Sequence, residues 1–304
     1  MVTTCMHRLP AGIELECRVS GRPGRPLLLF LHGFPEGAFI WDELLAQFGA
    51  DYRCVAPNLR GYGRSSQPTA IGDYRAKHLV EDLAALIALE SPGNAAACVI
   101  AHDWGGALAW GLANRYPAQI QRLLILNSPH PGAFLRELQH NPVQQSASQY
   151  MHFLRRPDAP QLLAENRWQR MLSFFQHPDG SQPSWLTPEL QQRYREHWDL
   201  GVHGACMFYA ASPLVPPRPG SSSDELHDIR ELSLPEEMLH IPQPVRILWG
   251  DRDLALQPAL LDGLEQWVPR LQVEHLKGCS HWVVHEQPEA VRRALAEFLT
   301  PIHS

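Results

Sequence analysis

Short apolar runs recur along the chain, typically just before Gly, Asp or Asn. They cover Leu27–Leu31, Arg53–Ala56, Ala97–Ala101, Leu123–Leu126, Val245–Trp249 and Val273–Leu276. Runs of this kind are typical of strands that are buried on both faces. The stretches with helical spacing between them include Ala76–Leu89, Gly105–Arg115, Pro258–Trp267 and Pro288–Leu299. Strands that alternate with helices predict a doubly wound α/β fold, with a mostly parallel sheet covered by helices on both faces.

The alternation stops between about Pro131 and Ile241, a segment without a convincing buried strand and rich in Gln, His, Trp and Arg. Its amphipathic or mixed stretches predict helices that Pro or Gly interrupts. The predicted helices are Pro142–Leu154, Gln161–Phe175, Pro188–Leu200 and Val202–Ala211. We therefore expect a core formed by residues 1–130 and 241–304, with a mainly helical cap, residues 131–240, inserted over the carboxyl ends of the strands.

One stretch of the predicted cap, Pro213–Leu232, is rich in proline near its start and contains three consecutive serines. This composition predicts a long loop with little helix. A solvated connector is favoured over a mobile gate above a pocket.

Composition and charge exclude some classes of function. The chain has 304 residues, 44% of them hydrophobic, which is enough for a substantial core. Lys and Arg number 26 against 32 for Asp and Glu, and no basic run exceeds a pair, so a nucleic-acid partner is not expected. The amino terminus lacks the apolar region of a signal peptide, and no window approaches about 18 uncharged apolar residues. We expect a cytoplasmic protein that does not enter a membrane.

The six cysteines are scattered without a CxxC pair. They are Cys5, Cys17, Cys54, Cys98, Cys206 and Cys279. This distribution predicts neither a zinc ribbon nor a disulfide framework, and fits free thiols in a reducing compartment.

The sequence AHDWGG, residues 101–106, joins an apolar run to a stretch with helical spacing. Small residues two positions before and after a central residue are typical of a nucleophile elbow, a sharp turn from strand to helix that exposes a nucleophile. Asp103 holds the central position. A carboxylate is ionised near neutral pH and attacks without a base, but its attack on an ester would give an anhydride. Asp103 therefore predicts displacement at a saturated carbon, which leaves an alkyl ester on the enzyme.

Hydrolysis of such an ester needs a base that activates water. His281, in the sequence GCSHW, follows the last apolar run and is the predicted base. The sequence WGDRD, residues 249–253, follows another run and offers Asp251 and Asp253 to orient the imidazole. The resulting order along the chain, nucleophile, acid and then histidine, is that of a hydrolase triad built on an elbow.

Ester hydrolysis also needs donors for an oxyanion. The sequence LHGFP, residues 31–35, ends the first apolar run, where a His-Gly turn can aim a backbone N–H at the site. The predicted donors are the backbone N–H groups of Phe34 and Trp104. Removal of one such donor raises a reaction barrier by about 3 kcal/mol, so the two donors are expected to lower the barrier to ester hydrolysis substantially.

Six motifs in order, HGFPE, GYGRSSQP, HDWGG, NSPHP, GDRD and GCSHW, lie between about Leu27 and Leu299. Together they resemble the epoxide hydrolase branch of the α/β-hydrolase family, which is related to haloalkane and fluoroacetate dehalogenases. The resemblance implies an α/β-hydrolase fold and favours Asp253 as the acid. It also implies two steps: Asp103 opens an epoxide, and water activated by His281 and Asp253 then releases a vicinal diol.

The same resemblance implies two cap tyrosines that bind the epoxide oxygen and protonate the emerging alkoxide. Tyr150, in SQYMHFLRRP, and Tyr209, in GACMFYAAS, match this pattern, although both could instead be packing aromatics of a helical lid. Together with Phe34 and Trp104, an apolar pocket would be lined by Phe153, Met207, Trp282 and Val283. Such a pocket would take a small apolar epoxide, aryl or medium aliphatic. No metal or organic cofactor is implied.

Two other functions are considered. A haloalkane dehalogenase would use the same Asp103, but such enzymes commonly carry Asn after the His-Gly pair, where this chain has Phe34. Fluoroacetate dehalogenases tend to carry arginine beside the nucleophile, where Trp104 and Gly105 stand here. A catalytically idle hydrolase-fold binding protein would have a damaged triad, and this chain has candidates for every position. The sequence leaves the oligomeric state open, a homodimer included.

Overall fold

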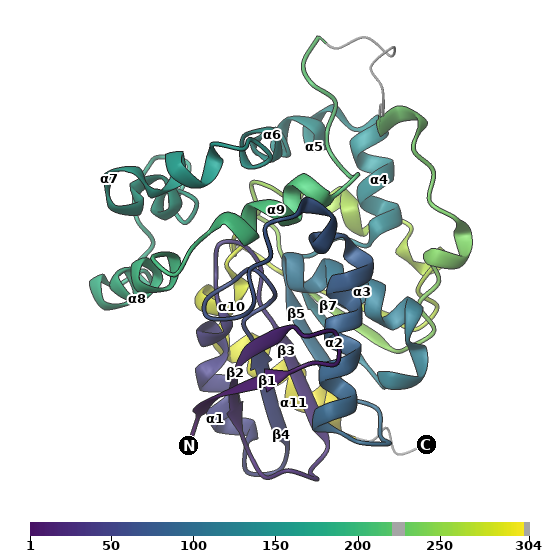
Figure 1. The fold of residues 1–304 in the computed structure, drawn as a ribbon. Coiled ribbons are helices and arrows are strands. Elements are labelled where there is room, and N and C mark those ends of the chain that lie inside the picture. The colour runs from purple at the N-terminus through teal and green to yellow at the C-terminus, as the bar shows by residue number, and fades with distance from the viewer. Residues whose placement is uncertain (221–228, 301–304) are drawn as a thin grey trace.

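An eight-stranded sheet forms the centre of the protein in the computed structural model, which describes residues 1–220 and 229–300. The strands are β1 Thr3–Arg8, β2 Glu14–Ser20, β3 Leu27–Leu31, β4 Arg53–Pro57, β5 Cys98–His102, β6 Leu123–Leu126, β7 Val245–Gly250 and β8 Leu271–Leu276. Their order across the sheet is β1-β2-β4-β3-β5-β6-β7-β8 (Figure 1). The strands from β4 to β8 in this order run parallel, and β1 and β2 are antiparallel to their neighbours.

Two separate apolar cores lie on the two faces of this sheet. On β3, Leu29 and Leu31 point into one core, whereas Leu28 and Phe30 point into the other. All residues of this strand are fully buried, because successive side chains of a strand point to opposite faces and both faces are covered. The predicted doubly wound α/β fold is confirmed.

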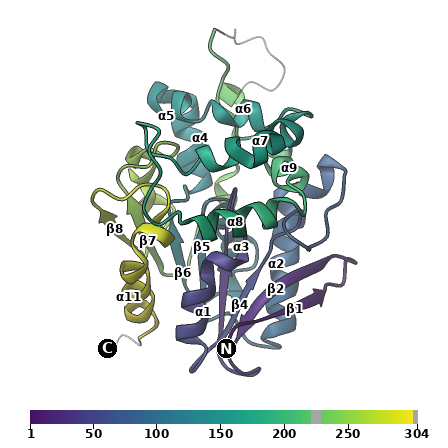
Figure 2. The ribbon, with the colours of Figure 1, turned by 90° about the vertical axis from the view of Figure 1, so that its left-hand side faces the viewer.

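Helices cover both faces. They are α1 Asp42–Phe48, α2 Ala76–Glu90, α3 Trp104–Arg115, α10 Val283–Glu286 and α11 Pro288–Leu299. Helices α1, α10 and α11 pack on one core, and α2 and α3 pack on the other (Figure 2). None of the helices in the described ranges is long and apolar enough to cross a membrane.

The hairpin of β1 and β2 was not predicted from the sequence. Inward-facing and outward-facing residues alternate on these strands, and on β1 Cys5 and His7 are half-buried whereas Met6 and Arg8 are exposed. A strand at the edge of a sheet carries polar side chains on its open face, so it lacks the continuous apolar run used to find the other strands.

The predicted helix Pro258–Trp267 is wrong. Two short 3-10 helices, Pro258–Leu261 and Leu264–Gln266, replace it. Gly263 between them has φ 68°, a left-handed conformation that ends a helix. The other 3-10 helices of the described chain are Ala38–Trp41, Ile71–Tyr74, Pro117–Gln119, Ile229–Glu231 and Glu236–Met238.

Helices α4 to α9 lie between β6 and β7 in the chain and above the carboxyl ends of the strands (Figure 1). They are α4 Pro131–His140, α5 Pro142–Ala147, α6 Tyr150–Leu154, α7 Ala159–Ser173, α8 Pro188–Trp198 and α9 His203–Ala211. The single helix predicted for Pro142–Leu154 is thus two helices, and α7 is kinked between Glu165 and Trp168. In the predicted loop Pro213–Leu232, residues 221–228 lie outside the described residues.

Helix α8 forms two hydrogen bonds with the core. The indole N–H of Trp198 donates to the carbonyl oxygen of Pro35 at 2.6 Å, and the hydroxyl of Tyr194 donates to Glu36 at 2.7 Å. Both core residues belong to the loop after β3 that carries the predicted oxyanion donor Phe34. Helix α8 therefore contacts the same loop that approaches Asp103.

Candidate active site

Asp103 stands at the turn from β5 to α3, with φ 50° and ψ −123°. A residue other than glycine in this region of conformational space is strained, as the elbow requires. A Cβ on Gly105 would lie 2.5 Å from the carbonyl oxygen of Leu31, and one on Gly106 would lie 2.3 Å from the Cβ of Ser128. The two glycines therefore let α3 approach β3 and the loop after β6, and this approach holds Asp103 at the tip of the turn.

The loop after β3 places a backbone donor on Asp103. The N–H of Phe34 donates to Oδ1 of Asp103 at 2.7 Å. A Cβ on Gly33 would lie only 2.2 Å from that same oxygen, which explains the glycine of the His-Gly turn. Trp104 is the first residue of α3, so its N–H has no partner inside the helix. Its role as the second donor stays a prediction.

The structure brings the three predicted triad residues together. Nδ1 of His281 lies 2.6 Å from Oδ2 of Asp253, and Nε2 of the same ring lies 3.7 Å from Oδ2 of Asp103. Asp251, the other carboxylate of the motif, instead contacts the exposed His275 at 2.8 Å. Of the two aspartates that the sequence offered, Asp253 is the one that contacts the imidazole.

Asp253 is held by several donors besides His281. Its Oδ2 also accepts from Nδ2 of Asn127 at 2.7 Å, and its Oδ1 accepts from the backbone N–H groups of Ala255 and Leu256 at 2.8 and 2.9 Å. Burial alone would raise the pKa of this carboxyl group, but His281 and these hydrogen bonds outweigh burial and lower its pKa. Asp253 is therefore a fixed carboxylate.

Asn127 is a site residue that sequence reasoning missed. It follows the strand β6, as the first residue of the motif NSPHP. Its Oδ1 also accepts from the N–H of Gly250 at 2.7 Å, so Asn127 links the ends of β6 and β7 while its amide binds Asp253. The motif NSPHP contains this residue, but its uncharged side chain gave no sign that it would contact the carboxylate of Asp253.

The charge state of His281 is set by its neighbours. Burial disfavours the imidazolium, but the carboxylates of Asp253, Asp103 and Glu36 outweigh it and raise the pKa of His281 to about 9. The ring is therefore an imidazolium at neutral pH, and Asp253 makes the largest contribution to this.

A cluster of buried polar side chains contacts the backbone of His281. Nε2 of His102 contacts the carbonyl oxygen of His281 at 2.9 Å, and Nδ1 of His102 contacts Glu36 at 3.1 Å. Glu36 also accepts from Tyr194 and from His285, each at 2.7 Å. Burial would raise the pKa of Glu36, but His102 and His285 reverse this effect and lower it. The sequence showed Glu36 only as the last residue of HGFPE, without a role.

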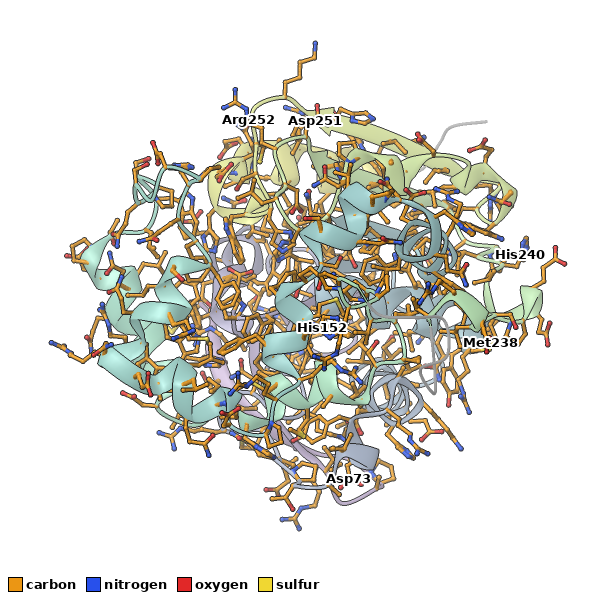
Figure 3. All side chains as sticks on the ribbon, turned by 90° about the horizontal axis from the view of Figure 1, so that it is seen from above. Asp73, His152, Met238, His240, Asp251 and Arg252 are labelled. Carbon is orange, nitrogen blue, oxygen red and sulfur yellow. The ribbon has the colours of Figure 1, made fainter. Side chains whose placement is uncertain are left out.

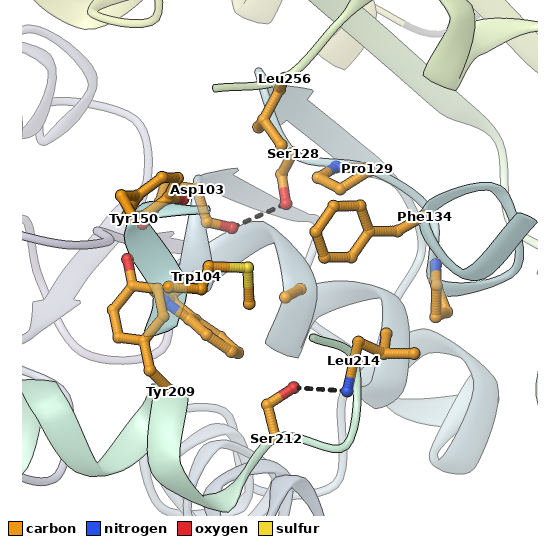
Figure 4. Close-up of a pocket in the computed structure, with 13 residues that line it drawn as sticks. Asp103, Trp104, Ser128, Pro129, Phe134, Tyr150, Tyr209, Ser212, Leu214 and Leu256 are labelled. Atoms are coloured by element: carbon orange, nitrogen blue, oxygen red, sulfur yellow. Dashed lines mark hydrogen bonds between the residues drawn. The ribbon is translucent and has the colours of Figure 1, made fainter. Parts of the chain in front are cut away.

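The two predicted tyrosines face Asp103 from the cap. Tyr150 is the first residue of α6 and Tyr209 lies in α9, and their ring centres are 6.1 Å apart. Figure 4 shows both rings beside Asp103. Burial raises the pKa of each phenol most. The charge of Asp103 follows burial for Tyr150, and Tyr150 and then Asp103 follow it for Tyr209. Both tyrosines therefore remain protonated at neutral pH.

Two cavities meet at Asp103, Tyr150 and Tyr209, which line both of them. The smaller, about 90 Å³, is almost entirely apolar. Its other main lining side chains are Trp104, Phe134, Met151, Leu214 and Leu256 (Figure 4).

The larger cavity, about 730 Å³, mixes apolar and polar walls. Its apolar walls include Phe34, Phe174 and Trp282, and its polar walls include Gln176, His177, Arg252, Gln257 and Glu286. Arg252 lies at the rim of the molecule (Figure 3). Across residues 1–220 and 229–300, no group of three or more His, Cys, Asp or Glu side chains could hold a metal ion.

Only some of the residues predicted to form an apolar pocket line the two cavities. Trp282 lines the larger cavity, but Phe153, Met207 and Val283 are absent from the described lining of both cavities. Val283 is fully buried in the core on the other face of the sheet. Met207 is buried among core residues, and Phe153 packs under the guanidinium of Arg170. These side chains pack elsewhere, and a helix presents only part of its surface to one side.

Comparison with known proteins places the chain in a family. The family model described as alpha/beta hydrolase fold matches residues 26–288. The chain belongs to the α/β-hydrolase family. Among curated α/β-hydrolases, the chain is 32% identical to the AB hydrolase superfamily protein YfhM of Bacillus subtilis, over 95% of each protein. It is 30% identical to Epoxide hydrolase 3 of Xenopus tropicalis, over 95% of this chain and 75% of that protein.

Solved structures of α/β-hydrolases have a fold similar to that of this chain. The epoxide hydrolase of Bacillus megaterium in complex with an inhibitor superposes with a TM-score of 0.85 and 31% identity, over 97% of this chain and 99% of that one. An epoxide hydrolase from metagenomes of hot environments gives a TM-score of 0.86 and 32% identity, over 99% of each chain. The resemblance found in the motifs is thereby confirmed, and the protein is a hydrolase that groups with epoxide hydrolases.

Proposed function

We propose that this α/β-hydrolase converts an epoxide into a vicinal diol through a covalent ester on Asp103. The observation that carries the proposal is the environment of that carboxylate. Its Oδ1 accepts a hydrogen bond from Phe34, its Oδ2 faces His281, and two protonated phenols lie beside it where the cavities meet. The epoxide hydrolases among its relatives support the same reaction.

In the first step, Oδ2 of Asp103 attacks one carbon of the epoxide and the bond from that carbon to the ring oxygen breaks. Oδ1 stays bound to the N–H of Phe34 and becomes the carbonyl oxygen of the new ester. The electron pair of the broken bond passes to the departing oxygen. A carboxylate suits this step because it is anionic without help from a base.

Tyr150 and Tyr209 supply the acid in the first step. The departing oxygen would be a poor leaving group as an alkoxide, and a phenol within hydrogen-bond reach can give it a proton as the bond breaks. Both phenols hold their proton until then because burial and the charge of Asp103 raise their pKa. A halide, in contrast, leaves without protonation.

In the second step, water attacks the carbonyl carbon of the ester. Ester formation removes the charge of Asp103, one of the carboxylates that raise the pKa of His281. The pKa of the imidazole therefore falls, and the ring returns its proton to the phenolate that the first step left. The neutral ring, oriented by Asp253, then accepts a proton from the attacking water. The N–H of Phe34 stabilises the oxyanion that forms. As this intermediate collapses, the bond to the diol oxygen breaks and that oxygen takes a proton from His281, while the regenerated carboxyl group of Asp103 returns its own proton to the ring.

The two cavities indicate the shape of the substrate. An epoxide held at Asp103 extends one substituent into the small apolar cavity and the other into the larger cavity with polar walls. A variant of the Bacillus megaterium enzyme was solved with its product, a naphthyloxy-propane-1,2-diol. We propose an aryl or medium aliphatic epoxide, with its apolar group in the small cavity.

Water is the second substrate, and both proposed steps use only carboxylate, imidazole, phenol and backbone groups. The scattered cysteines fit a reducing compartment, so we propose a cytoplasmic location.

The decisive experiment traps the ester. His281→Gln is incubated with styrene oxide or with a bromoalkane, and the intact protein is then weighed. We expect a stable adduct with styrene oxide, on the peptide that contains Asp103, because the second step lacks its base. An adduct with the bromoalkane alone would instead establish a dehalogenase.

Two controls accompany the trap. His240→Gln changes an exposed histidine at the rim of the molecule (Figure 3) and should turn over without a lasting adduct. Asp103→Asn combined with His281→Gln should form no adduct, since the nucleophile is gone. An adduct in that double variant would contradict the assignment of Asp103.

A second experiment tests the phenols. Tyr150→Phe combined with Tyr209→Phe should abolish styrene oxide opening and leave any reaction with a bromoalkane in place, because only the alkoxide needs a proton. Tyr52→Phe is the matched control, at a half-buried residue that packs against Phe48 at the edge of the core. Equal loss of both reactions would show that the two cap tyrosines are structural.

A further inference from the structure

A pair of cysteines lies at the amino-terminal edge of the sheet, outside the active site. Cys5 on β1 and Cys17 on β2 are directly opposite each other in the antiparallel register. Opposite residues of such a pair have Cα atoms about 4.5 or 5.5 Å apart, and both distances fall within the range of about 4.4 to 6.8 Å found in disulfides. The register therefore gives the two backbone positions the Cα spacing of a disulfide, although both residues are free thiols in the structure.

The two cysteines share one face of the sheet. Cys17 is fully buried in the apolar core on that face, and the half-buried Cys5 packs against the same core. The other cysteine near this edge, Cys54 on β4, belongs to the core on the opposite face. The sheet backbone thus separates Cys54 from the pair, so Cys5 has Cys17 as its cross-strand neighbour.

A chain of charged side chains begins beside Cys5. Its Sγ lies 3.3 Å from Nε2 of His7, which also contacts Oε1 of Glu90 at 2.7 Å. Glu90 in turn accepts two hydrogen bonds from the guanidinium of Arg53, at 2.7 and 3.0 Å. Arg53 balances the charge of Glu90, so a protonated His7 leaves one positive charge beside the sulfur of Cys5. A neighbouring imidazolium stabilises a thiolate, which is the reactive form of cysteine.

The imidazole of His7 is charged at neutral pH. Its contact with Cys5 and its contact with Glu90 outweigh burial and raise its pKa to about 9. His7 on β1 contacts the sulfur directly and Cys17 on β2 lies opposite it. Glu90 at the end of α2 contacts His7, and Arg53 on β4 contacts Glu90.

We propose that Cys5 is a peroxide-reactive thiol and that Cys17 resolves it, so that the two form a reversible cross-strand disulfide. The oxidant is hydrogen peroxide. The Cys5 thiolate attacks one peroxide oxygen, the O–O bond breaks, and hydroxide leaves, which gives a sulfenic acid on Cys5. The sulfur of Cys17 then attacks the sulfur of Cys5, the S–OH bond breaks, and water leaves with the proton of the Cys17 thiol.

Mass spectrometry tests this pairing in the full chain. The reduced protein is exposed to hydrogen peroxide, denatured in excess N-ethylmaleimide and weighed. We expect two fewer maleimides than the six that the reduced chain accepts. Trypsin cuts after Arg8 and Arg18, so residues 1–8 and 9–18 should appear as one linked pair of peptides, which a thiol reductant separates. Six maleimides after peroxide, or a link to another cysteine, would overturn the proposal.

Variants separate the roles of the residues. Cys17→Ser should leave the sulfenic acid on Cys5, where dimedone traps it, and Cys54→Ser should form the disulfide as the wild type does. His7→Gln should slow the loss of the Cys5 thiol at neutral pH by about fivefold, because the stabilising charge is gone. An equal rate in His7→Gln would refute the activation by the imidazolium. Circular dichroism of each variant checks that the hairpin and the sheet are intact.

Discussion

The pH dependence of stability offers a direct test of the charge state assigned to His281. The pKa of this ring is about 9 in the folded protein and 6.5 in its ordinary state. A group whose pKa is raised on folding stabilises the protein fully below its unfolded pKa, and this contribution is lost as the pH rises through its folded pKa. The contribution of His281 should therefore be complete below pH 6.5 and absent above about pH 9.

The size of the effect follows from the same two values. Between them, the free energy of unfolding should fall by about 1.4 kcal/mol for each pH unit because of this ring alone. The difference between 6.5 and about 9 corresponds to roughly 3 kcal/mol in all. The side chain of His281 is only 12% exposed, so solvent screening takes little from this figure.

Urea unfolding from pH 6 to pH 10 measures the effect. His281→Gln should be less stable than the wild type at low pH, and the difference between the two proteins should shrink as the pH rises. His7 titrates in the same range, but it is present in both proteins, so its contribution cancels in the difference. The exposed His240→Gln is the matched control and should follow the wild type. A difference between wild type and His281→Gln that stays constant with pH would refute the charge assignment.

Three further predictions concern the site and the cap. Gly33→Ala places a Cβ 2.2 Å from Oδ1 of Asp103, so kcat/KM for styrene oxide should fall about a hundredfold or more; an unchanged rate would argue against the oxyanion loop. Asn127→Ala removes a donor from the buried Asp253, and chemical denaturation should show a loss of about 1 to 3 kcal/mol; a stability equal to that of the wild type would contradict this contact. Trp198→Phe removes the hydrogen bond from α8 to the core, so limited proteolysis should cut the cap faster, whereas unchanged cleavage would mean that other contacts hold the cap.

The local features of the site could be predicted because their causes lie close together in the chain. The buried strands β3, β5 and β6 appear as apolar runs, since both faces of the sheet are covered. The turn at Asp103 appears as small residues on either side of the nucleophile. The choice between Asp251 and Asp253, in contrast, rested on a family pattern, and only the contact with His281 distinguishes them in this chain.

Other features could not be predicted because they join distant segments. Phe153, Met207 and Val283 occupy the predicted part of the chain, but the orientation of their helices turns them away from the cavities. The contact of Asn127 with Asp253 spans more than a hundred positions and depends on the pairing of β6 with β7.

The sequence by itself determined the alternation of strands and helices, the sharp turn at Asp103 and the order of Asp103, Asp253 and His281 along the chain. These properties depend on periodicity and on steric demands within a few residues. The tertiary structure decided which side chains line the two cavities, that Glu36 is buried among histidines, and that Cys5 lies opposite Cys17. The reason is that strand register and helix packing set the distances between remote residues, and these distances set contacts, charge states and reactivity.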